Sequence, residues 1–211
     1  MAANRGSISD KLLDRGERLS VATMHEAAGR CGALPDDLRP LDSAMRVIGR
    51  ALPVRCPSGD NLWIHRAIAR ARPQDVIIVE VGASGTAFGY WGEIMASAAI
   101  ARGVAGLVIN GGVRDSTRLI ELGLPTFSAR ITVRGTTKDP AKDGAVGEPI
   151  RLGDVIIRHG DLVLGDADGV IALTPNQARR AIPASERREA DERDIIERIG
   201  SGALTIDIYN L

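Results

Sequence analysis

The sequence predicts a single α/β domain, and three observations support this. Residues 76–81 and 104–109 are short and almost entirely apolar, as expected for parallel strands buried on both faces. A glycine-rich loop and a helix starting near Gly92 separate them, which is the order of a right-handed strand–helix–strand crossover. After Ile150 the pattern changes to short β segments between glycine turns, and 211 residues are enough for one large core.

The amino-terminal part predicts two helices and then a strand. Residues 1–7 are expected to form a disordered lead, and Ser9 to cap a first short helix. A second helix is expected over residues 23–28. Residues 45–56 alternate loosely and contain glycine and proline, so we expect a strand with a bend or two short strands.

The middle of the chain predicts the elements that surround the candidate site. In order, they are a turn at 57–60, a helix over 62–71 capped by Asp60, a strand at 76–81, a glycine loop at 82–89, a helix from Gly92, a strand at 104–109, a glycine turn at Gly111 and Gly112, a helix capped by Asp115 or Ser116 that ends at Gly123, and a strand from Leu124.

The carboxyl-terminal third predicts a long surface loop over residues 135–149 and β segments at 155–158, 161–164 and 170–173. Pro175 then opens a highly charged helix that runs to about Ile199, and Pro183 is expected to break or kink it. Such a charged helix is expected to lie in solvent or on a neighbouring subunit.

The composition excludes several classes of function. The formal net charge is zero, so no strongly basic face is expected and nucleic acid is not a predicted partner. No apolar run reaches the length of a membrane span, and no signal-peptide core is visible, so we expect no membrane partner. The two cysteines, Cys31 and Cys56, have no metal-ligand spacing, and a reducing cytoplasm is the predicted location.

The chain is organised around Arg114 and Asp115, which follow the apolar strand and its two glycines. Asp115 can bind a hard divalent cation, and Arg114 can hold a carboxylate or a developing enolate. The structural alternative is that Asp115 only caps the next helix and Arg114 makes a surface ion pair. Glu93 supports the functional reading because it begins the preceding helix at the same sheet edge, although it too is a favourable first-turn acid.

The start of that preceding helix is a predicted anion site. The backbone N–H groups of Glu93, Ile94 and Met95, which follow Gly92, are expected to lack helical partners and to carry partial positive charge. A substrate carboxylate would bind there, beside Arg114.

These residues resemble a known family. An acidic residue, twenty intervening residues and Arg-Asp, here Glu93 to Arg114-Asp115, are similar to the divalent-metal-dependent aldolases that cleave 4-hydroxy-4-methyl-2-oxoglutarate and 4-carboxy-4-hydroxy-2-oxoadipate. Those aldolases share a fold with the RraA proteins, named as regulators of ribonuclease activity. Further likenesses occur at Gly59-Asp60-Asn61 with His65, Gly92-Glu93-Ile94-Met95, Gly111 to Asp115, Arg134-Gly135-Thr136, and Gly160-Asp161 with Asp168-Gly169-Val170.

The resemblance covers roughly residues 19–195 and implies a three-layer β/β/α fold of the swivelling kind. It implies that Asp115 ligates Mg²⁺ or Mn²⁺, that Arg114 contacts the pyruvoyl group, and that Glu93 orients a metal-bound water. It implies a homotrimer, or a hexamer made of two trimers, with sites between subunits. The family aldolases also use a glutamate from an adjacent subunit, and either Glu189 or Glu192 matches it.

The implied reaction is retro-aldol cleavage of a 2-oxo acid to pyruvate plus pyruvate or oxaloacetate, with oxaloacetate decarboxylation as a side activity. A Schiff-base route is disfavoured. Only three of the 27 basic residues are lysines, and Lys11, Lys138 and Lys142 are expected to lie outside the pocket.

The histidines and tryptophans are expected to have mainly structural roles, and two other functions remain as alternatives. The histidines, His25, His65 and His159, are expected to be structural, with His65 as a candidate supporting group beside the site. Trp63 and Trp91 are expected in the core or at a subunit interface, and residues 136–138 in a mobile loop near the site. The main functional alternative is a protein-binding regulator of the RraA type. A remote one is an S-adenosylmethionine-dependent methyltransferase, suggested by residues 79–86. The strand expected to carry the ribose acid ends at Asn110 instead.

Overall fold

The computed structural model describes residues 8–211, so the expected amino-terminal lead lies outside the described part. The helices are α1 (Asp10–Gly16), α2 (Val21–Ala27), α3 (Leu62–Arg70), η1 (Ala83–Gly85), α4 (Glu93–Ile100), α5 (Ser116–Leu122), α6 (Pro175–Gly200) and α7 (Thr205–Tyr209). The strands are β1 (Arg39–Pro40), β2 (Val47–Cys56), β3 (Asp75–Val81), β4 (Gly89–Trp91), β5 (Gly106–Val113), β6 (Thr126–Ile131), β7 (Ala145–Val146), β8 (Ile150–Leu152), β9 (Val155–Ile157), β10 (Leu162–Asp166) and β11 (Gly169–Leu173).

One mixed sheet of nine strands organises residues 8–211. Its main path runs β1-β6-β5-β3-β2-β10-β11, with β4 added beside β5 and β7 beside β2. Strands β2, β3, β5 and β6 are parallel, while β1, β7, β10 and β11 pair antiparallel with their neighbours. The parallel pairing of β3 with β5 around α4 confirms the predicted crossover.

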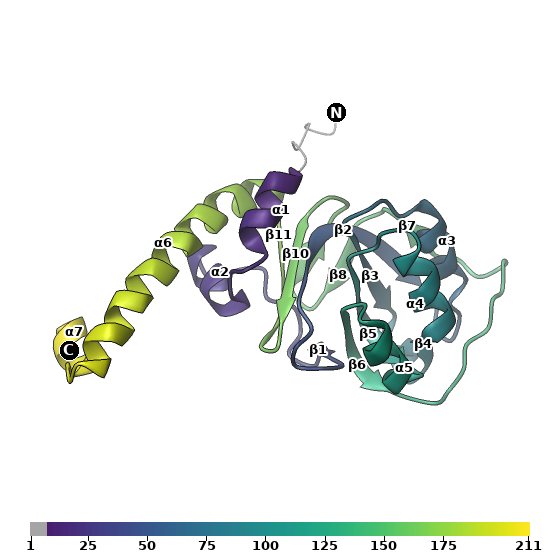
Figure 1. Ribbon diagram of the computed structural model, residues 1–211. Helices are drawn as coiled ribbons and strands as arrows, with labels where there is room; N and C mark the ends of the chain where they lie inside the picture. Colours follow the sequence, from purple (N-terminus) through teal and green to yellow (C-terminus); the bar gives the residue numbers. More distant parts are fainter. Residues whose placement is uncertain (1–7) are drawn as a thin grey trace.

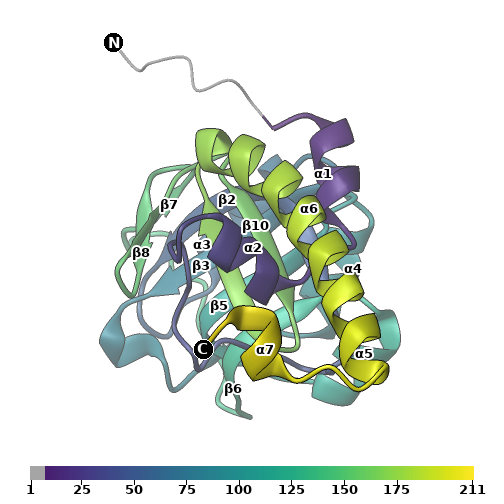
Figure 2. The same cartoon turned by 90° about the vertical axis from the view of Figure 1, so that its left-hand side faces the viewer.

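The strands divide their side chains between separate cores, because successive residues of a strand point to opposite faces. In β3, Ile77 and Val79 face α3, α4 and α5, whereas Val76 and Ile78 face the hairpin β8–β9 on the other side. A third core packs β10 and β11 against α1, α2 and α6. Figures 1 and 2 show α3, α4 and α5 on one side of the sheet and α1, α2 and α6 on the other. The predicted α/β fold is confirmed, and its sheet is mixed and nearly closed.

The expected glycine turn at Gly111 and Gly112 is wrong, because both residues belong to β5. A side chain at Gly111 would lie 2.9 Å from the Tyr90 ring, and one at Gly112 would lie 2.8 Å from the carbonyl oxygen of Phe88. The glycines therefore let the unpredicted strand β4 approach β5. The strand continues past Asn110 and carries Arg114 directly at its end.

Three further expectations need correction. Residues 47–56 form a single strand, so the alternative of two short strands is wrong; Pro53 lies inside the strand, beside Ile78 in the register with β3. Pro183 does not break the carboxyl-terminal helix, since α6 is continuous from Pro175 to Gly200. The cap position of α3 is Asn61, although the Asp60 carboxylate still accepts a bond from the Leu62 N–H.

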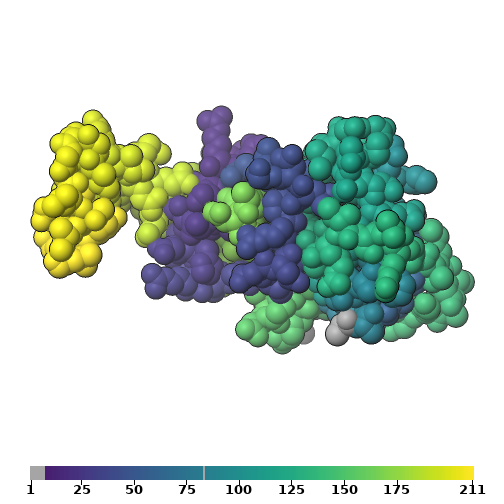
Figure 3. Space-filling view, turned by 90° about the horizontal axis from the view of Figure 1, so that it is seen from below, coloured from purple at the N-terminus to yellow at the C-terminus, as the bar shows by residue number. Residues whose placement is uncertain are grey.

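The second half of α6 extends away from the body of the molecule and carries α7 at its tip (Figures 1 and 3). Its first half is held by buried residues, including Ala178 and Ile182, that pack against α1 and α2. We call residues 190–211 the arm. Among residues 8–211, no helix combines the length and the apolar character that crossing a membrane requires.

Candidate active site

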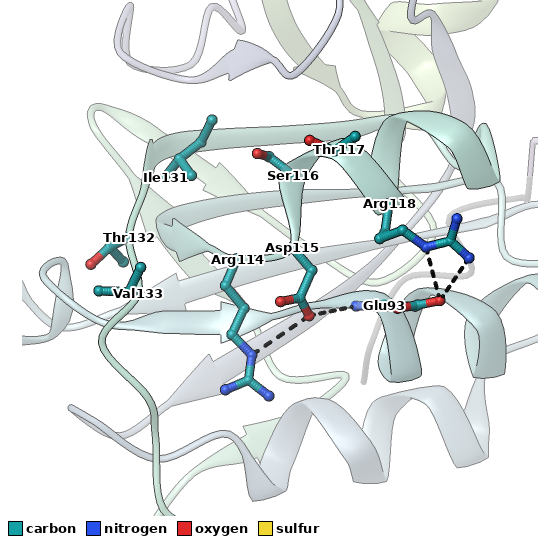
Figure 4. A pocket seen from close by; sticks show the side chains of 9 residues that line it. All are labelled: Glu93, Arg114, Asp115, Ser116, Thr117, Arg118, Ile131, Thr132 and Val133. Atoms are coloured by element: carbon teal, nitrogen blue, oxygen red, sulfur yellow. Dashed lines mark hydrogen bonds and ion pairs between the residues drawn. The ribbon is translucent and has the colours of Figure 1, made fainter.

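Two hydrogen bonds hold the start of α4 beside the residues that follow β5. The Glu93 N–H donates to Asp115 Oδ2 at 3.1 Å, so the carboxylate lies at the positive end of α4. The Arg114 N–H donates to the Trp91 carbonyl oxygen at 2.8 Å, which fixes the end of β5 beside the start of α4. The sheet edge therefore brings the three predicted residues together (Figure 4).

Asp115 adopts an unusual backbone conformation to reach this position. Its φ of 56° and ψ of 37° place it in the left-handed region, which aspartate tolerates better than most residues. It occupies the cap position of α5, but its side chain makes no capping bond there and turns toward α4 instead. The capping interpretation of Asp115 therefore explains its backbone position and not the direction of its side chain.

Gly92 leaves room for this arrangement. A side-chain carbon built on Gly92 would lie 2.4 Å from Asp115 Oδ2 and 3.1 Å from Arg114 Cγ. The backbone of Gly92 is extended, so its conformation suits any residue. The glycine is required here because the two charged side chains pass close to it.

Arg114 and Asp115 form a loose ion pair that remains open to solvent. Arg114 Nε lies 3.8 Å from Asp115 Oδ2, and the two side chains are 51% and 42% exposed. At this separation and exposure the pair contributes little stability. Both groups therefore keep bonding capacity for a ligand.

Glu93 is paired with a residue that the sequence reading missed. Arg118, from the first turn of α5, places Nε and Nη2 at 3.2 and 3.1 Å from Glu93 Oε1 (Figure 4). These bonds with Glu93 raise the pKa of Arg118. The spacing in the sequence could have identified Arg118, because a residue three positions after Asp115 lies on the same face of α5.

A cleft of about 880 Å³ lies over these residues. We call it the cleft; it is lined by Glu93, Arg114, Asp115, Ser116, Thr117, Arg118, Ile131, Thr132 and Val133. Glu93, Arg114 and Asp115 thus share one open cavity rather than pointing into separate regions.

A smaller cavity of about 120 Å³ shares Arg114 and Asp115 with the cleft. We call it the inner pocket; it is lined by Asn61, His65, Tyr90, Gly92, Ile94, Met95, Arg114, Asp115 and Lys138. The expectation that Lys138 lies outside the pocket is therefore wrong. His65, the candidate supporting group, lies in this pocket.

The loop that carries Lys138 is held by a buried carboxylate. Asp60 Oδ2 accepts bonds from the Thr137 hydroxyl at 2.8 Å and the Asp139 N–H at 2.6 Å. Burial acts to raise the pKa of Asp60, but these bonds and one from the Leu62 N–H outweigh it and lower the pKa. The sequence did not reveal this contact, because its partners lie more than 70 positions apart.

The predicted set of free amides at the start of α4 is only partly present. The Glu93 N–H binds Asp115, and the Met95 N–H donates to the Gly92 carbonyl oxygen at 3.1 Å. Within residues 8–211 the Ile94 N–H has no hydrogen-bond partner, and the Ile94 side chain is 78% exposed. The Glu93 N–H is not free because the Asp115 carboxylate of the same chain already occupies this end of the helix.

The remaining predicted residues lie elsewhere. Glu189 Oε1 accepts a bond from the Ser20 N–H, and Glu192 Oε1 one from Arg188 Nε, so neither lines the cleft of its own chain. Trp91 is fully buried, as expected, and Trp63 packs at the edge of the same core.

The number of carboxylates at the cleft decides how a divalent cation could be held there. In the described part of the chain, no three His, Cys, Asp or Glu side chains converge into a metal-binding group. Mg²⁺, however, is commonly held by one or two carboxylates, with water and substrate oxygens completing its shell. A half-exposed Asp115 at an open cleft fits that mode.

Comparisons with known proteins identify the family of this chain. A family model described as RraA-like: Aldolase/RraA matches residues 6–172. A Halalkalibacterium halodurans protein named "Putative 4-hydroxy-4-methyl-2-oxoglutarate aldolase" is 32% identical over 179 residues, covering 83% of this chain and 82% of that protein.

Solved structures give the same result. An uncharacterized protein from Pseudomonas syringae pv. tomato superposes with a TM-score of 0.81 at 28% identity, covering 94% of this chain and 96% of that one. RraAS2 of Streptomyces coelicolor, described as an unusual member of the RNase ES inhibitor RraA protein family, gives 0.76 at 25% identity, covering 90% and 98%. This chain therefore belongs to the RraA-like family.

Proposed function

We propose that this protein is a divalent-metal-dependent pyruvate aldolase. It cleaves 4-hydroxy-4-methyl-2-oxoglutarate or 4-carboxy-4-hydroxy-2-oxoadipate to pyruvate plus pyruvate or oxaloacetate, and it decarboxylates oxaloacetate as a side activity. The observation that carries the proposal is the shared cleft, in which Arg114, Asp115 and Glu93 face one open cavity. The similarity to a relative that bears an aldolase name supports it.

Asp115 would hold Mg²⁺ or Mn²⁺, with substrate oxygens and water completing its coordination. When bound, the cation supplies Lewis-acid stabilisation of the negative charge that develops on the 2-oxo group as C3–C4 breaks. Arg114 presents its guanidinium fork to the pyruvoyl carboxylate and stabilises the same charge. The Ile94 N–H is a further donor for that carboxylate.

Glu93 is proposed to orient the water that removes the proton of the C4 hydroxyl. Its carboxylate is fixed by Arg118, so it can accept a bond from that water without changing position. C4 becomes the ketone of the leaving product, and C3 takes up a proton to give pyruvate. The proton lost and the proton gained balance, so the water can serve both steps.

The decisive experiment follows pyruvate release from 4-hydroxy-4-methyl-2-oxoglutarate, with Mg²⁺ and after chelation by EDTA. We expect turnover that chelation abolishes and added Mg²⁺ or Mn²⁺ restores, and an Arg114→Ala variant that loses most of the rate. Because Lys138 lines the inner pocket, the protein should also be treated with borohydride in the presence of pyruvate. This treatment would trap a Schiff base between the lysine and pyruvate if one formed. Inactivation by borohydride, or full activity in EDTA, would contradict the metal-dependent reading.

A regulator of the RraA type is the second candidate, and the similarity to RraAS2 favours it. Such a function requires binding to a ribonuclease and no turnover. If no pyruvate were released with any metal tested, the regulator function would be favoured over the aldolase function. The methyltransferase reading has less support, since the Asn110 side chain bonds the Val81 backbone through both its oxygen and its nitrogen.

We also propose that the protein works as a homotrimer or as a pair of trimers. The arm exposes several large apolar side chains that its own chain leaves uncovered. These are Ile196, Ile199, Leu204, Ile206, Tyr209 and Leu211. Exposed apolar surface of this kind is typical of a protein interface. Helix α6 of one subunit would bring Glu189, just before the arm, or Glu192, within it, toward a neighbouring cleft. Sedimentation of the wild type and of Ile196→Asp tests this, and a monomeric wild type would refute it.

A further inference from the structure

Asn61, which lines the inner pocket, has an amide oxygen without a partner among residues 8–211. Asn61 Nδ2 donates to the Tyr90 carbonyl oxygen at 2.8 Å and to Met95 Sδ at 3.3 Å. A carbonyl oxygen only accepts hydrogen bonds, so this contact fixes the nitrogen there and leaves Oδ1 as the free atom. Asn61 is 6% exposed, and within residues 8–211 its Oδ1 has no hydrogen-bond partner.

The position of Asn61 makes this free oxygen unusual. An asparagine at a helix cap ordinarily accepts a bond from an N–H of the first helical turn. Asn61 holds the cap position of α3 and makes no such bond. A buried acceptor without a partner costs free energy, so the unpaired Oδ1 of Asn61 indicates a place for a ligand that donates a hydrogen bond. Its side chain is held by Tyr90 and Met95 with the oxygen unused.

A second unpaired atom lies one helical turn away. His65 follows Asn61 by four residues, which places both on the same face at the start of α3. Its Nε2 is buried and, in the described part of the chain, makes no hydrogen bond. Burial and the nearby Lys138 charge lower the pKa of His65, so the imidazole is neutral near pH 7 and each ring nitrogen either donates or accepts.

The chemistry of these two atoms selects one kind of ligand group. Asn61 Oδ1 only accepts, so the group must donate a hydrogen bond; an ionised carboxylate has none to give. An ammonium group would donate, but the lining of the same small cavity carries two cations, Lys138 and Arg114, against one carboxylate, Asp115, and the excess positive charge would repel it. A hydroxyl group donates its one proton to Asn61 Oδ1, and its oxygen accepts a hydrogen bond from His65 Nε2–H, so the tautomer protonated at Nε2 is the one that fits.

From this arrangement we infer that the inner pocket binds the C4 hydroxyl of the substrate through Asn61 Oδ1 and His65 Nε2, before the proton of that hydroxyl passes to water. It thereby selects hydroxylated 2-oxo acids over those without the hydroxyl. The inference rests on the proposed function for the identity of the substrate. The pocket shares Arg114 and Asp115 with the cleft, so a substrate held by these two residues reaches both cavities.

The test uses reactions that differ in their need for the hydroxyl. Cleavage of 4-hydroxy-2-oxoglutarate requires it, whereas oxaloacetate has no hydroxyl at that carbon. In Asn61→Leu and His65→Phe we expect the ratio of kcat/KM for cleavage to that for decarboxylation to fall about tenfold or more. His65→Gln, which restores a nitrogen able to bond, should recover part of the ratio. His25→Gln, on α2 and outside both cavities, is the matched control and should leave the ratio unchanged.

Calorimetry separates failure of this inference from failure of the proposed function. If no variant or wild-type protein turns over either compound, binding of 4-hydroxy-2-oxoglutarate and of 2-oxoglutarate can be compared directly in the presence of Mg²⁺. The inference then requires that the hydroxylated compound bind about tenfold tighter to the wild type and that Asn61→Leu remove the difference. Equal affinities, or an unchanged kcat/KM ratio in both folded variants, would overturn it and leave the pocket as a site for water. Thermal unfolding of each variant establishes that it is folded.

Discussion

The Gly92→Ala substitution tests the account with one added carbon. Gly92 lies where Asp115 and Arg114 approach the start of α4, and its extended backbone accepts alanine without strain. The added carbon would lie 2.4 Å from Asp115 Oδ2, whereas an ordinary contact is about 3.5 Å. The Asp115 carboxylate must therefore move by about 1 Å.

This displacement should reduce activity far more than stability. The atom that moves is the end of a side chain, so the fold loses little more than the hydrogen bond from the Glu93 N–H, about 1 kcal/mol. For a domain of this size that corresponds to a fall in Tm of about 2 to 4 °C. A misplacement of about 1 Å in a group that positions the substrate can cost about 100-fold in rate.

The assay compares kcat/KM for pyruvate release with the thermal unfolding temperature. Gly82→Ala is the matched control, because Gly82 has a φ of −54° and no described atom within 4 Å of an added side-chain carbon. We expect wild-type activity in Gly82→Ala and a loss of about 100-fold in Gly92→Ala, with both proteins folded. Near-wild-type turnover in Gly92→Ala would refute the claim that the Asp115 carboxylate must lie where it does.

Three further substitutions test separate parts of the site. Asp115→Asn keeps the side-chain shape and tolerates the left-handed backbone but removes the charge, so metal-dependent turnover should fall by about 100-fold or more with Tm nearly unchanged; retained turnover would exclude Asp115 as a metal ligand. Arg118→Gln removes an exposed partner of Glu93, so Tm should change little while kcat falls several-fold because Glu93 is no longer held in place; an unchanged kcat would contradict the role of Arg118 in positioning Glu93. Asp60→Asn should destabilise the protein at pH 7 by about 2 to 3 kcal/mol. Because the pKa of Asp60 is lowered in the folded state, its contribution is complete above the ordinary carboxylate pKa and is lost as the pH falls below about 4. Denaturant unfolding at several pH values should show the difference from wild type shrinking on acidification, and a constant difference would contradict the assignment.

The parts of the fold that the sequence revealed are those set by local pattern. Residues 76–81 are apolar except for Glu80 because β3 is covered on both faces, and that burial is visible as composition. Glu93 and Asp115 could be placed on one edge because the carboxyl ends of parallel strands, and the helices that follow them, meet there. Their roles in binding metal and substrate stay predictions.

The parts that the sequence did not reveal depend on contacts between distant segments. Gly111 and Gly112 suggest a turn, but both glycines are needed because Tyr90 of β4 and Phe88, the residue just before β4, come close to them. Lys138 was placed outside the pocket because nothing local indicates that Asp60 holds its loop. Helix α6 passes through Pro183 because its neighbours Ala181 and Ile182 are buried against the body, and tertiary packing outweighs the local preference for a break.

The central claim is that Asp115 and Arg114 hold a divalent cation and a 2-oxo acid in the same cleft. A crystal structure of the protein with Mg²⁺ and pyruvate tests it most directly, since it locates both ligands at once. The account predicts the cation on the Asp115 carboxylate and the pyruvate carboxylate beside the Arg114 guanidinium. Binding of both ligands at another place, with the cleft between α4 and α5 holding only water, would contradict it.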